Sequence, residues 1–368
     1  MTSLSLEPPE DRFPGLREHL AAKFGPAAGL ARIDPLATAP GAKGGGYGVP
    51  QLVRWRSSDG DHRYVLETVR PGGFGHEDRA DRASLVLRAL DDYGEMPRHV
   101  RAVDAGAFSR SGAAVGLAGS EEFFLLTDFV EGEPYARDLE RIAARCRLEP
   151  LDRDRALALA EYLAAIHREP VVHETWYRRR LRDLAGSGEC IAGIADSYPE
   201  GDFPGPAILE RVESLALHWR YRLRDRTERL RRIHGDFHPW NILFRKDADF
   251  TVLDRSRGRF GDPADDVAAL VVNYLFFALR QHGRFEGAFA ELFHLFWNRY
   301  RLSSGDASLA DVIAPHFAFR TLVLANPVWY PSESPATRRA LFRFLLATLE
   351  ADRFDPEGLE ALLGEEKS

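Results

Sequence analysis

The chain has 368 residues, of which 45% are hydrophobic and 29% are charged, so we expect a globular protein of two domains or lobes that folds without disulfides. A net charge of −7 argues against nucleic acid as an obligate partner, because neutralising phosphates requires a basic surface. The two cysteines, Cys146 and Cys190, lack metal-binding spacing and fit a reducing cytoplasm, and the first residues do not resemble a signal peptide.

The first third of the chain is predicted to form a small sheet with one main helix. After a short helix in "GLREHLAAKFG", a glycine-rich loop leads into two β-rich runs joined by the turn residues "SSDGD" (39–69). Leucines at helical spacing predict a helix over 77–94. Two further strands are expected at 99–109 and 121–132.

From about Pro134 onward the pattern becomes mostly helical. Helices are predicted over 153–170, over 208–232 and from about Asp265 to the end, interrupted by a strand–loop–strand insert. The apolar run 267–279 is too short to span a bilayer, so it predicts a buried helix.

The insert carries the residues that could bind a metal or take part in a reaction. "HGDFHPWNIL" places Asp236 and Asn241 on a loop before one short strand, and Asp254 ends the next strand, "FTVLD". Such a hairpin would bring Asn241 and Asp254 together, with Asp236 facing the same space. Oxygen ligands from one asparagine and one aspartate suit Mg²⁺, and a free aspartate beside it can orient or deprotonate a hydroxyl group.

The order of these features resembles the aminoglycoside phosphotransferase family, which has the protein-kinase-like fold. The resemblance covers roughly residues 35–350 and is carried by "LLTDFVEG" and by "HGDFHPWN…VLD…GDPADD". It implies an α+β, bilobal fold with a small antiparallel sheet lobe, residues 1–130, that binds nucleotide. A large, mainly helical lobe, residues 131–368, would hold the catalytic and substrate residues.

The resemblance also implies roles for individual residues. Asp236 would be the catalytic base, Asn241 and Asp254 the Mg²⁺ ligands, and Asp266 a buried support for the catalytic loop. The segment from Asp128 to Val130 would bond the adenine of ATP through its backbone. In the glycine-rich loop, backbone N–H groups of Gly45 and Gly46 could cover phosphate oxygens, although this loop is neither a Walker A nor a dinucleotide motif.

One position departs from the family pattern. The strand lysine that pairs with ATP phosphates is expected in "YVLETV", where the sequence has Glu67, and its helix partner would fall near Ala83. Three explanations remain open. Glu67 pairs with Arg79 or Arg82 in a charge-swapped ion pair, or Lys43 of the glycine-rich loop replaces the lysine. Alternatively, the protein has lost phosphoryl transfer and kept nucleotide binding, or it catalyses a different transfer.

Several nearby residues have both a functional and a structural interpretation. His234 is expected to pack under the loop, and His238 is a turn residue or a participant in the chemistry. Arg255, Arg257 and Arg259 could contact phosphate or an anionic acceptor, or form a solvated charge run. Late in the chain, Trp329 and Tyr330 could contact the acceptor or pack in the core.

A metallophosphoesterase is an alternative, because Asp236-x-His238 and "GDPAD" match two of its motifs, but the sequence has no Asn-His pair for the third. The resemblance instead implies an ATP- and Mg²⁺-dependent phosphotransferase acting on a hydroxyl of a small molecule, and we expect it to be cytoplasmic. Neither nucleic acid nor a membrane is expected as a partner. The second hypothesis is a nucleotide-binding pseudokinase that serves as a scaffold, and the acceptor and oligomeric state are not predicted.

Overall fold

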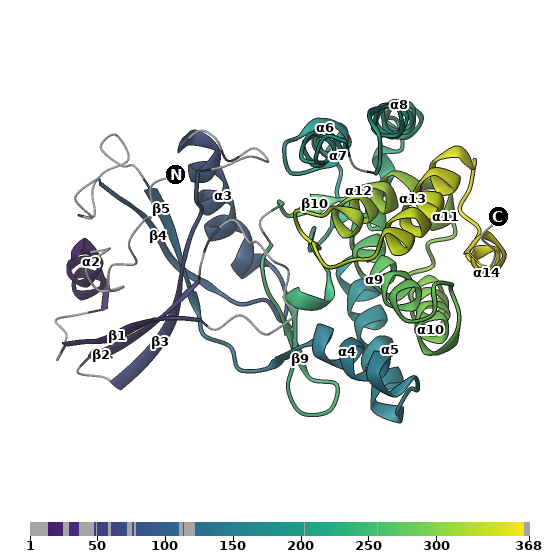
Figure 1. Cartoon of the computed structure of the whole chain (residues 1–368). Helices are drawn as coiled ribbons and strands as arrows, with labels where there is room; N and C mark the ends of the chain where they lie inside the picture. The colour runs from purple at the N-terminus through teal and green to yellow at the C-terminus, as the bar shows by residue number, and fades with distance from the viewer. Residues whose placement is uncertain are drawn as a thin grey trace. The chain divides into compact units, whose positions relative to one another are not determined.

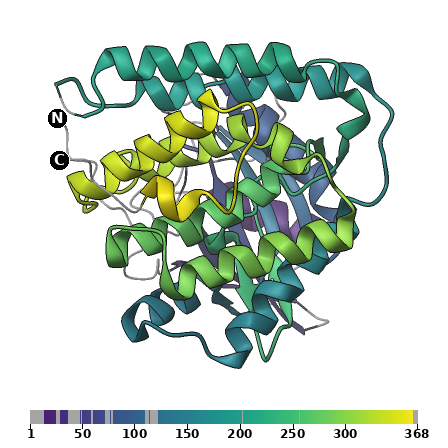
Figure 2. The ribbon, with the colours of Figure 1, turned by 90° about the vertical axis from the view of Figure 1, so that its right-hand side faces the viewer.

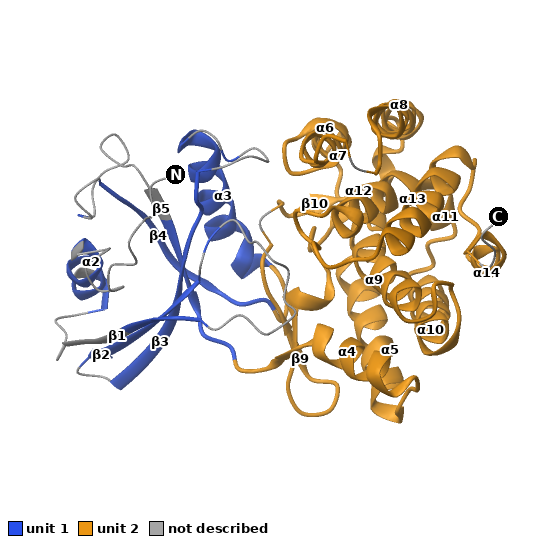
Figure 3. Cartoon of the chain, viewed as in Figure 1, with its two compact units in different colours: residues 1–42, 46–95, 99–130 blue, residues 43–45, 96–98, 131–368 orange. Residues whose placement is uncertain are grey.

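The computed structural model describes residues 14–24, 29–36, 48, 50–57, 60–71, 76, 79–109, 113, 122–201, 203–255 and 257–363. The chain divides into two compact units, which Figure 3 colours separately. Unit 1 comprises residues 1–42, 46–95 and 99–130, and unit 2 comprises residues 43–45, 96–98 and 131–368. The assignment of nucleotide binding to one and catalysis to the other stays a prediction.

Unit 1 contains a five-stranded antiparallel sheet (Figure 1). Its strands are β1 (Gly29–Pro35), β2 (Gln51–Ser57), β3 (Gly60–Thr68), β4 (Ala102–Phe108) and β5 (Glu122–Asp128). They follow the spatial order β1-β2-β3-β5-β4, and each neighbouring pair is antiparallel. Strands β2 to β5 form where the alternating runs predicted them, and Ser57 pairs with Gly60 at the expected hairpin turn, whereas β1 was not predicted.

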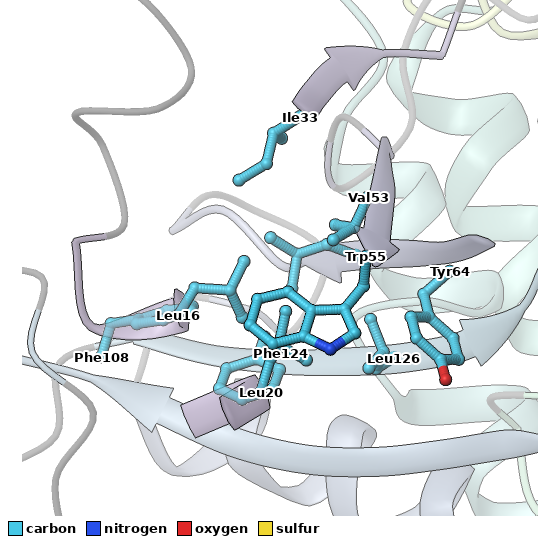
Figure 4. Packing of buried hydrophobic residues seen from close by; sticks show 10 residues of the cluster. Leu16, Leu20, Ile33, Val53, Trp55, Tyr64, Phe108, Phe124 and Leu126 are labelled. Carbon is cyan, nitrogen blue, oxygen red and sulfur yellow. The ribbon is translucent and has the colours of Figure 1, made fainter. Parts of the chain in front are cut away.

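One face of this sheet carries an apolar cluster that α2 (Pro14–Phe24) covers. Leu16 and Leu20 of the helix pack against alternate strand residues such as Trp55 and Phe124, all of them buried (Figure 4). Alternation along a strand turns every second side chain to the same face, which explains this spacing. The predicted main helix is α3 (Arg79–Asp92), which contacts β4 and β5 and lies on the other face (Figure 1).

Unit 2 is mainly helical, as predicted. Its helices are α4 (Tyr135–Arg145), α5 (Pro150–Ile166), α6 (Glu174–Gly186), α7 (Ile191–Asp196), α8 (Pro206–Leu223), α9 (Ala264–His282), α10 (Gly287–Ser304), α11 (Leu309–Val312), α12 (Ala314–Ala325), α13 (Pro335–Glu350) and α14 (Leu359–Leu363). Helices α6 and α8 contact one another along one edge of the unit (Figures 1 and 2).

The central helix of unit 2 is α9, which contacts α4, α10, α12 and α13. Every residue from Ala264 to Leu279 is buried, so the apolar run forms the buried helix that its length predicted. Asn273 is accommodated there because its side chain donates to the carbonyl of Ala269 at 2.7 Å. In the described parts of the chain, no helix combines the length and apolarity needed to cross a membrane.

The helix predicted over 208–232 extends too far at its C-terminal end. Helix α8 starts at Pro206 and ends at Leu223, and the chain continues as a short 3₁₀ turn and the strand β7 (Arg231–Arg232). The helical pattern is overridden because Arg229 is buried in ion pairs with Asp262 and Asp306. Strand β7 then pairs with β10 (Phe260–Gly261), which no continuous helix could do.

The predicted strand–loop–strand insert forms a small sheet within unit 2. Its strands are β6 (Glu133–Pro134), β8 (Ile242–Phe244) and β9 (Phe250–Val252), in the order β6-β8-β9. The hairpin of β8 and β9 pairs Ile242 with Val252, so the loop before β8 and the residues after β9 lie side by side. The insert therefore presents its polar residues at one end of the hairpin.

Candidate active site

The loop between β7 and β8, residues 233–241, is held in place mainly through its backbone. Ile233 donates to the carbonyl of Arg259 at 3.1 Å, and the loop ends in a 3₁₀ turn, Pro239–Asn241. Gly235 has φ +87°, a left-handed conformation, and an added Cβ would come within 3.3 Å of the Arg257 side chain. Glycine therefore fits both the backbone conformation and the space before Asp236.

Asp266 supports this loop through hydrogen bonds to its backbone, in line with the expected support role. Its fully buried carboxylate accepts hydrogen bonds from the backbone N–H groups of His234 and Gly235, both at 2.7 Å. His167 lies 3.0 Å from the same carboxylate and 2.9 Å from the hydroxyl of Tyr300. Because α9 carries Asp266, the position of the loop is coupled to the central helix of the unit.

Asp236 and Asn241 contact each other directly. The side-chain amide of Asn241 donates to the backbone carbonyl of Asp236 at 3.0 Å and lies 3.4 Å from its Oδ2. His238 is also near that oxygen, with Nε2 at 3.5 Å, and its Nδ1 accepts from the N–H of Trp240. His238 therefore both shapes the turn and faces the carboxylate, so its two interpretations are compatible.

Asp254 lies beyond the strand to which the sequence assigned it. Strand β9 ends at Val252, and Leu253 donates to the carbonyl of Asn241 at 2.8 Å, which places Asn241 and Asp254 at the same end of the hairpin. Asp254 is exposed and has φ +57°, a conformation that aspartate tolerates better than most residues. The chain has left strand β9 before Asp254, so the backbone of Asp254 is not paired in the sheet.

Arg320 is the main residue that the sequence interpretation missed. It is buried in α12, donates from Nη1 to Oδ1 of Asp236, and from Nη2 to the carbonyl of Gly235 at 2.8 Å. The same Nη2 donates to Oδ1 of Asp265 at 2.8 Å. The one available signal was a charged residue inside the apolar helical stretch "HFAFRTLVL", because buried arginines are rare unless paired.

The charges around Asp236 favour its ionised form. Burial raises the pKa of Asp236, but the surrounding cations, Arg257 foremost, lower it well below the usual range. Arg257 lies 3.9 Å from Oδ1 of Asp236 and stacks over the ring of Phe319. Asp236 is therefore an anion at neutral pH, ready to accept a hydrogen bond.

The three arginines after Asp254 have different environments. Arg255 is fully buried and donates to the carbonyls of Ile233 and Arg259, at 3.0 and 2.8 Å, so it fixes backbone and is not part of a solvated charge run. Arg257 faces Asp236, as described above. Arg259 is partly exposed and lies over the ring of Phe260.

The late aromatic pair also separates into two environments. Trp329 is buried, in agreement with a packing role. Tyr330 is partly exposed, and its ring lies 6.3 Å from that of Trp240 in the loop and 5.3 Å from that of Phe276. Tyr330 thus joins the C-terminal helices to the turn that carries Asn241.

Of the predicted nucleotide-binding residues, Glu67, Asp128 and Val130 belong to unit 1 and are described by the structure. Glu67 lies on β3 opposite Leu125, and alternation turns it away from the cluster that contains Leu66. On α3, Arg82 is buried and donates to the carbonyl of His76 at 2.9 Å, whereas Arg79 is exposed. Lys43, Gly45 and Gly46 lie outside the described residues.

The segment predicted to bond adenine begins at the end of β5. The backbone N–H of Asp128 donates to the carbonyl of Arg101 at 3.1 Å, and its carboxylate accepts from the Arg101 side chain at 3.2 Å. Val130 is partly buried. Hydrogen bonding of this segment's backbone to adenine stays a prediction.

The residues at the hairpin end are suited to a hard cation. Asn241 uses its amide nitrogen towards Asp236, which leaves its amide oxygen for a ligand, and Asp254 offers an exposed carboxylate. Within the described residues, no group of three or more His, Cys, Asp or Glu side chains could hold a metal ion by itself. Substrate oxygens would complete the coordination, as Mg²⁺ commonly requires.

The chain is similar to known phosphotransferases in its sequence profile and in its fold. The profile of the phosphotransferase enzyme family APH matches residues 46–302, and a search of curated protein sequences finds no match. Among solved structures, amicoumacin kinase hAmiN, in complex with AMP-PNP, Ca²⁺ and Ami, is 13% identical with a TM-score of 0.55, covering 93% of this chain and 96% of that one. A thermostable mutant of aminoglycoside phosphotransferase APH(4)-Ia, with ADP and hygromycin B, is 14% identical with a TM-score of 0.51, covering 92% and 99%.

Proposed function

Because the chain belongs to the APH phosphotransferase enzyme family, we propose that it transfers the γ-phosphoryl group of ATP to a hydroxyl group of a small molecule. The observation that carries this proposal is the arrangement of Asp236, an ionised and buried carboxylate beside Asn241 at the open end of the β8–β9 hairpin. Family membership also removes the metallophosphoesterase alternative. Free thiols at Cys146 and Cys190 suit the reducing cytoplasm in which we place the enzyme.

Asp236 would act on the acceptor hydroxyl more by orientation than by strong basicity. A carboxylate whose pKa is lowered holds a proton poorly, but it accepts a hydrogen bond well. Phosphoryl transfer through a loose transition state needs little proton removal before the phosphorus–oxygen bond to ADP has largely broken. Alignment of the hydroxyl oxygen with the γ-phosphorus is then the main contribution of Asp236.

Asn241 and Asp254 would hold the divalent cation through their side-chain oxygens. Bound there, Mg²⁺ would neutralise charge on the ATP phosphates. The hydrogen bond from Asn241 to Asp236 would keep the metal ligand and the acceptor-orienting carboxylate in a fixed relation. Backbone groups of Gly45, Gly46, Asp128 and Val130 are proposed to bind the nucleotide.

Glu67 is the observation that favours a second candidate, a nucleotide-binding pseudokinase. A carboxylate on β3 at the position of the family lysine would repel ATP phosphates unless a cation compensates, by about 1 kcal/mol or more. Lys43, or an arginine of α3 paired with Glu67, would supply that cation in an active enzyme. The two candidates differ in turnover and not in ATP binding.

The test is an ATP- and Mg²⁺-dependent assay of ADP release over a panel of aminoglycosides, amino alcohols, sugars, macrolides and peptide antibiotics. We expect turnover with at least one acceptor, and Asp236→Asn should lower kcat by roughly 10²- to 10⁴-fold. Asp249→Asn, at an exposed surface ion pair, is the matched control and should retain activity. ATP binding without turnover on the whole panel would support the pseudokinase instead.

A further inference from the structure

Arg320 connects three separate parts of unit 2 through one buried guanidinium. It lies on α12, 84 residues from Asp236, and its nitrogens donate to Asp236, to the carbonyl of Gly235 and to Asp265 on α9. Only 6% of the residue is exposed. These contacts combine the catalytic loop and two packed helices into one arrangement.

The chemistry of this contact requires an arginine. A planar guanidinium presents its donors in a fixed fork, so Nη1 and Nη2 can hold two acceptors at set angles, which the single ammonium of lysine cannot reproduce. Asp236 and Asp265 are both buried, and their negative charges would oppose each other without the cation between them. Asp265 in turn fixes Arg320 and lies 3.7 Å from Arg180.

The two oxygens of Asp236 have unequal surroundings. Oδ1 receives the hydrogen bond from Arg320, and Arg257 lies 3.9 Å from the same atom. Among the residues that the structure describes, Oδ2 has only long contacts, 3.4 Å to the amide of Asn241 and 3.5 Å to His238. Distances beyond about 3.2 Å are long for a hydrogen bond, so Oδ2 keeps capacity for another donor.

We propose that Arg320 is a positioning residue for phosphoryl transfer: it anchors Oδ1 of Asp236 so that Oδ2 receives the acceptor hydroxyl. This inference rests on the proposed function. Arg320 does not touch the reacting atoms itself. Its effect should therefore fall on kcat, through misaligned approach of the hydroxyl, with the KM for ATP unchanged.

The kinetic test compares three variants with a matched control. Arg320→Met should lower kcat roughly 10²-fold, and Arg320→Lys should recover part of that loss. Arg320→Met combined with Asp265→Asn removes one cation and one anion together, so it remains informative if the single variant fails to fold. Arg155→Met removes another buried arginine, which donates to the carbonyls of Arg245 and Asp247, and should lower stability without a comparable loss of kcat.

A crystallographic readout keeps the two proposals distinguishable. In crystals of the double variant, we expect the Asp236 carboxylate to leave the orientation that it has in the wild type. An unchanged carboxylate orientation, or a kcat in the Arg320 variants equal to or above wild type, would overturn the positioning role. If the wild type transfers phosphate to no acceptor, the proposed function fails, while the carboxylate orientation still decides whether Arg320 anchors Asp236.

Discussion

Burial raises the pKa of Asp236, and side chains from three places in the chain lower it well below its usual range. His238 comes from the same loop, Arg257 follows the hairpin, and Arg320 lies on a C-terminal helix. Together they keep a buried carboxylate ionised, which suits a residue that orients a hydroxyl and does not need to store its proton. Glu67 lies on β3 where the resemblance places a lysine, so the proposed transfer requires another cation beside the ATP phosphates.

Lys43 is the lysine of the glycine-rich loop. If it replaces the family lysine, Lys43→Ala should lower kcat/KM for ATP by roughly 10²-fold or more, because a charge-assisted contact to phosphate is lost near the reacting group. Lys246→Ala removes an exposed lysine at the β8–β9 turn and should leave kinetics unchanged. Wild-type kinetics for Lys43→Ala would instead favour an arginine of α3 paired with Glu67.

The loop that carries Asp236 depends on its attachment to α9. Asp266 satisfies two backbone N–H groups of the loop that would otherwise be buried without acceptors, and Asp262 anchors the start of the same helix to Arg229. Both aspartates belong to "GDPADD", so this short motif stabilises the loop that carries Asp236, the residue proposed to orient the acceptor. Removing either attachment should lower the free energy of unfolding.

Asp266→Ala should destabilise the protein by about 3–5 kcal/mol, because it leaves buried donors unpaired beside His167. Chemical denaturation followed by circular dichroism measures the change. Asp311→Ala removes a partly exposed ion pair with Arg353 and should change the free energy of unfolding by no more than about 1 kcal/mol. Equal effects of the two substitutions would contradict the support role of Asp266.

The ion pair of Asp262 and Arg229 should make the free energy of unfolding depend on pH in the acidic range. Burial raises the pKa of Asp262, but the charge and hydrogen bonds of Arg229 bring it below its usual value. A lowered pKa in the folded state means that the stabilisation is complete above the unfolded value, about pH 4, and is lost as pH falls further. The difference in unfolding free energy between wild type and Asp262→Asn should therefore be constant from pH 5 to 7 and shrink below pH 4. A difference that stays constant down to pH 3 would contradict this account.

The elements of the fold could be predicted where local pattern decides them, and the geometry of the candidate site could be predicted only in part. Alternation and turn residues locate β2 and β3, and the spacing of Asp236, Asn241 and Asp254 indicates the site. The end of α8 and the role of Arg320 could not be predicted, because both depend on ion pairs between residues tens of positions apart. The register that turns Glu67 away from the α2 cluster likewise depends on pairing with β5.

Nucleotide binding should raise the thermal stability of the whole protein. A nucleotide that binds only the folded protein adds roughly 2.7 kcal/mol at a concentration of 100 times its Kd, so ATP with Mg²⁺ should raise Tm by several degrees. Because Asn241 and Asp254 are the proposed metal ligands, the double variant Asn241→Ala, Asp254→Ala should lose the Mg²⁺-dependent part of the shift. EDTA added to the wild type should remove the same part, whereas Asp249→Ala should keep the full shift. A shift that is insensitive to EDTA and to both alanines would place the metal elsewhere, or would show that nucleotide binding does not use one.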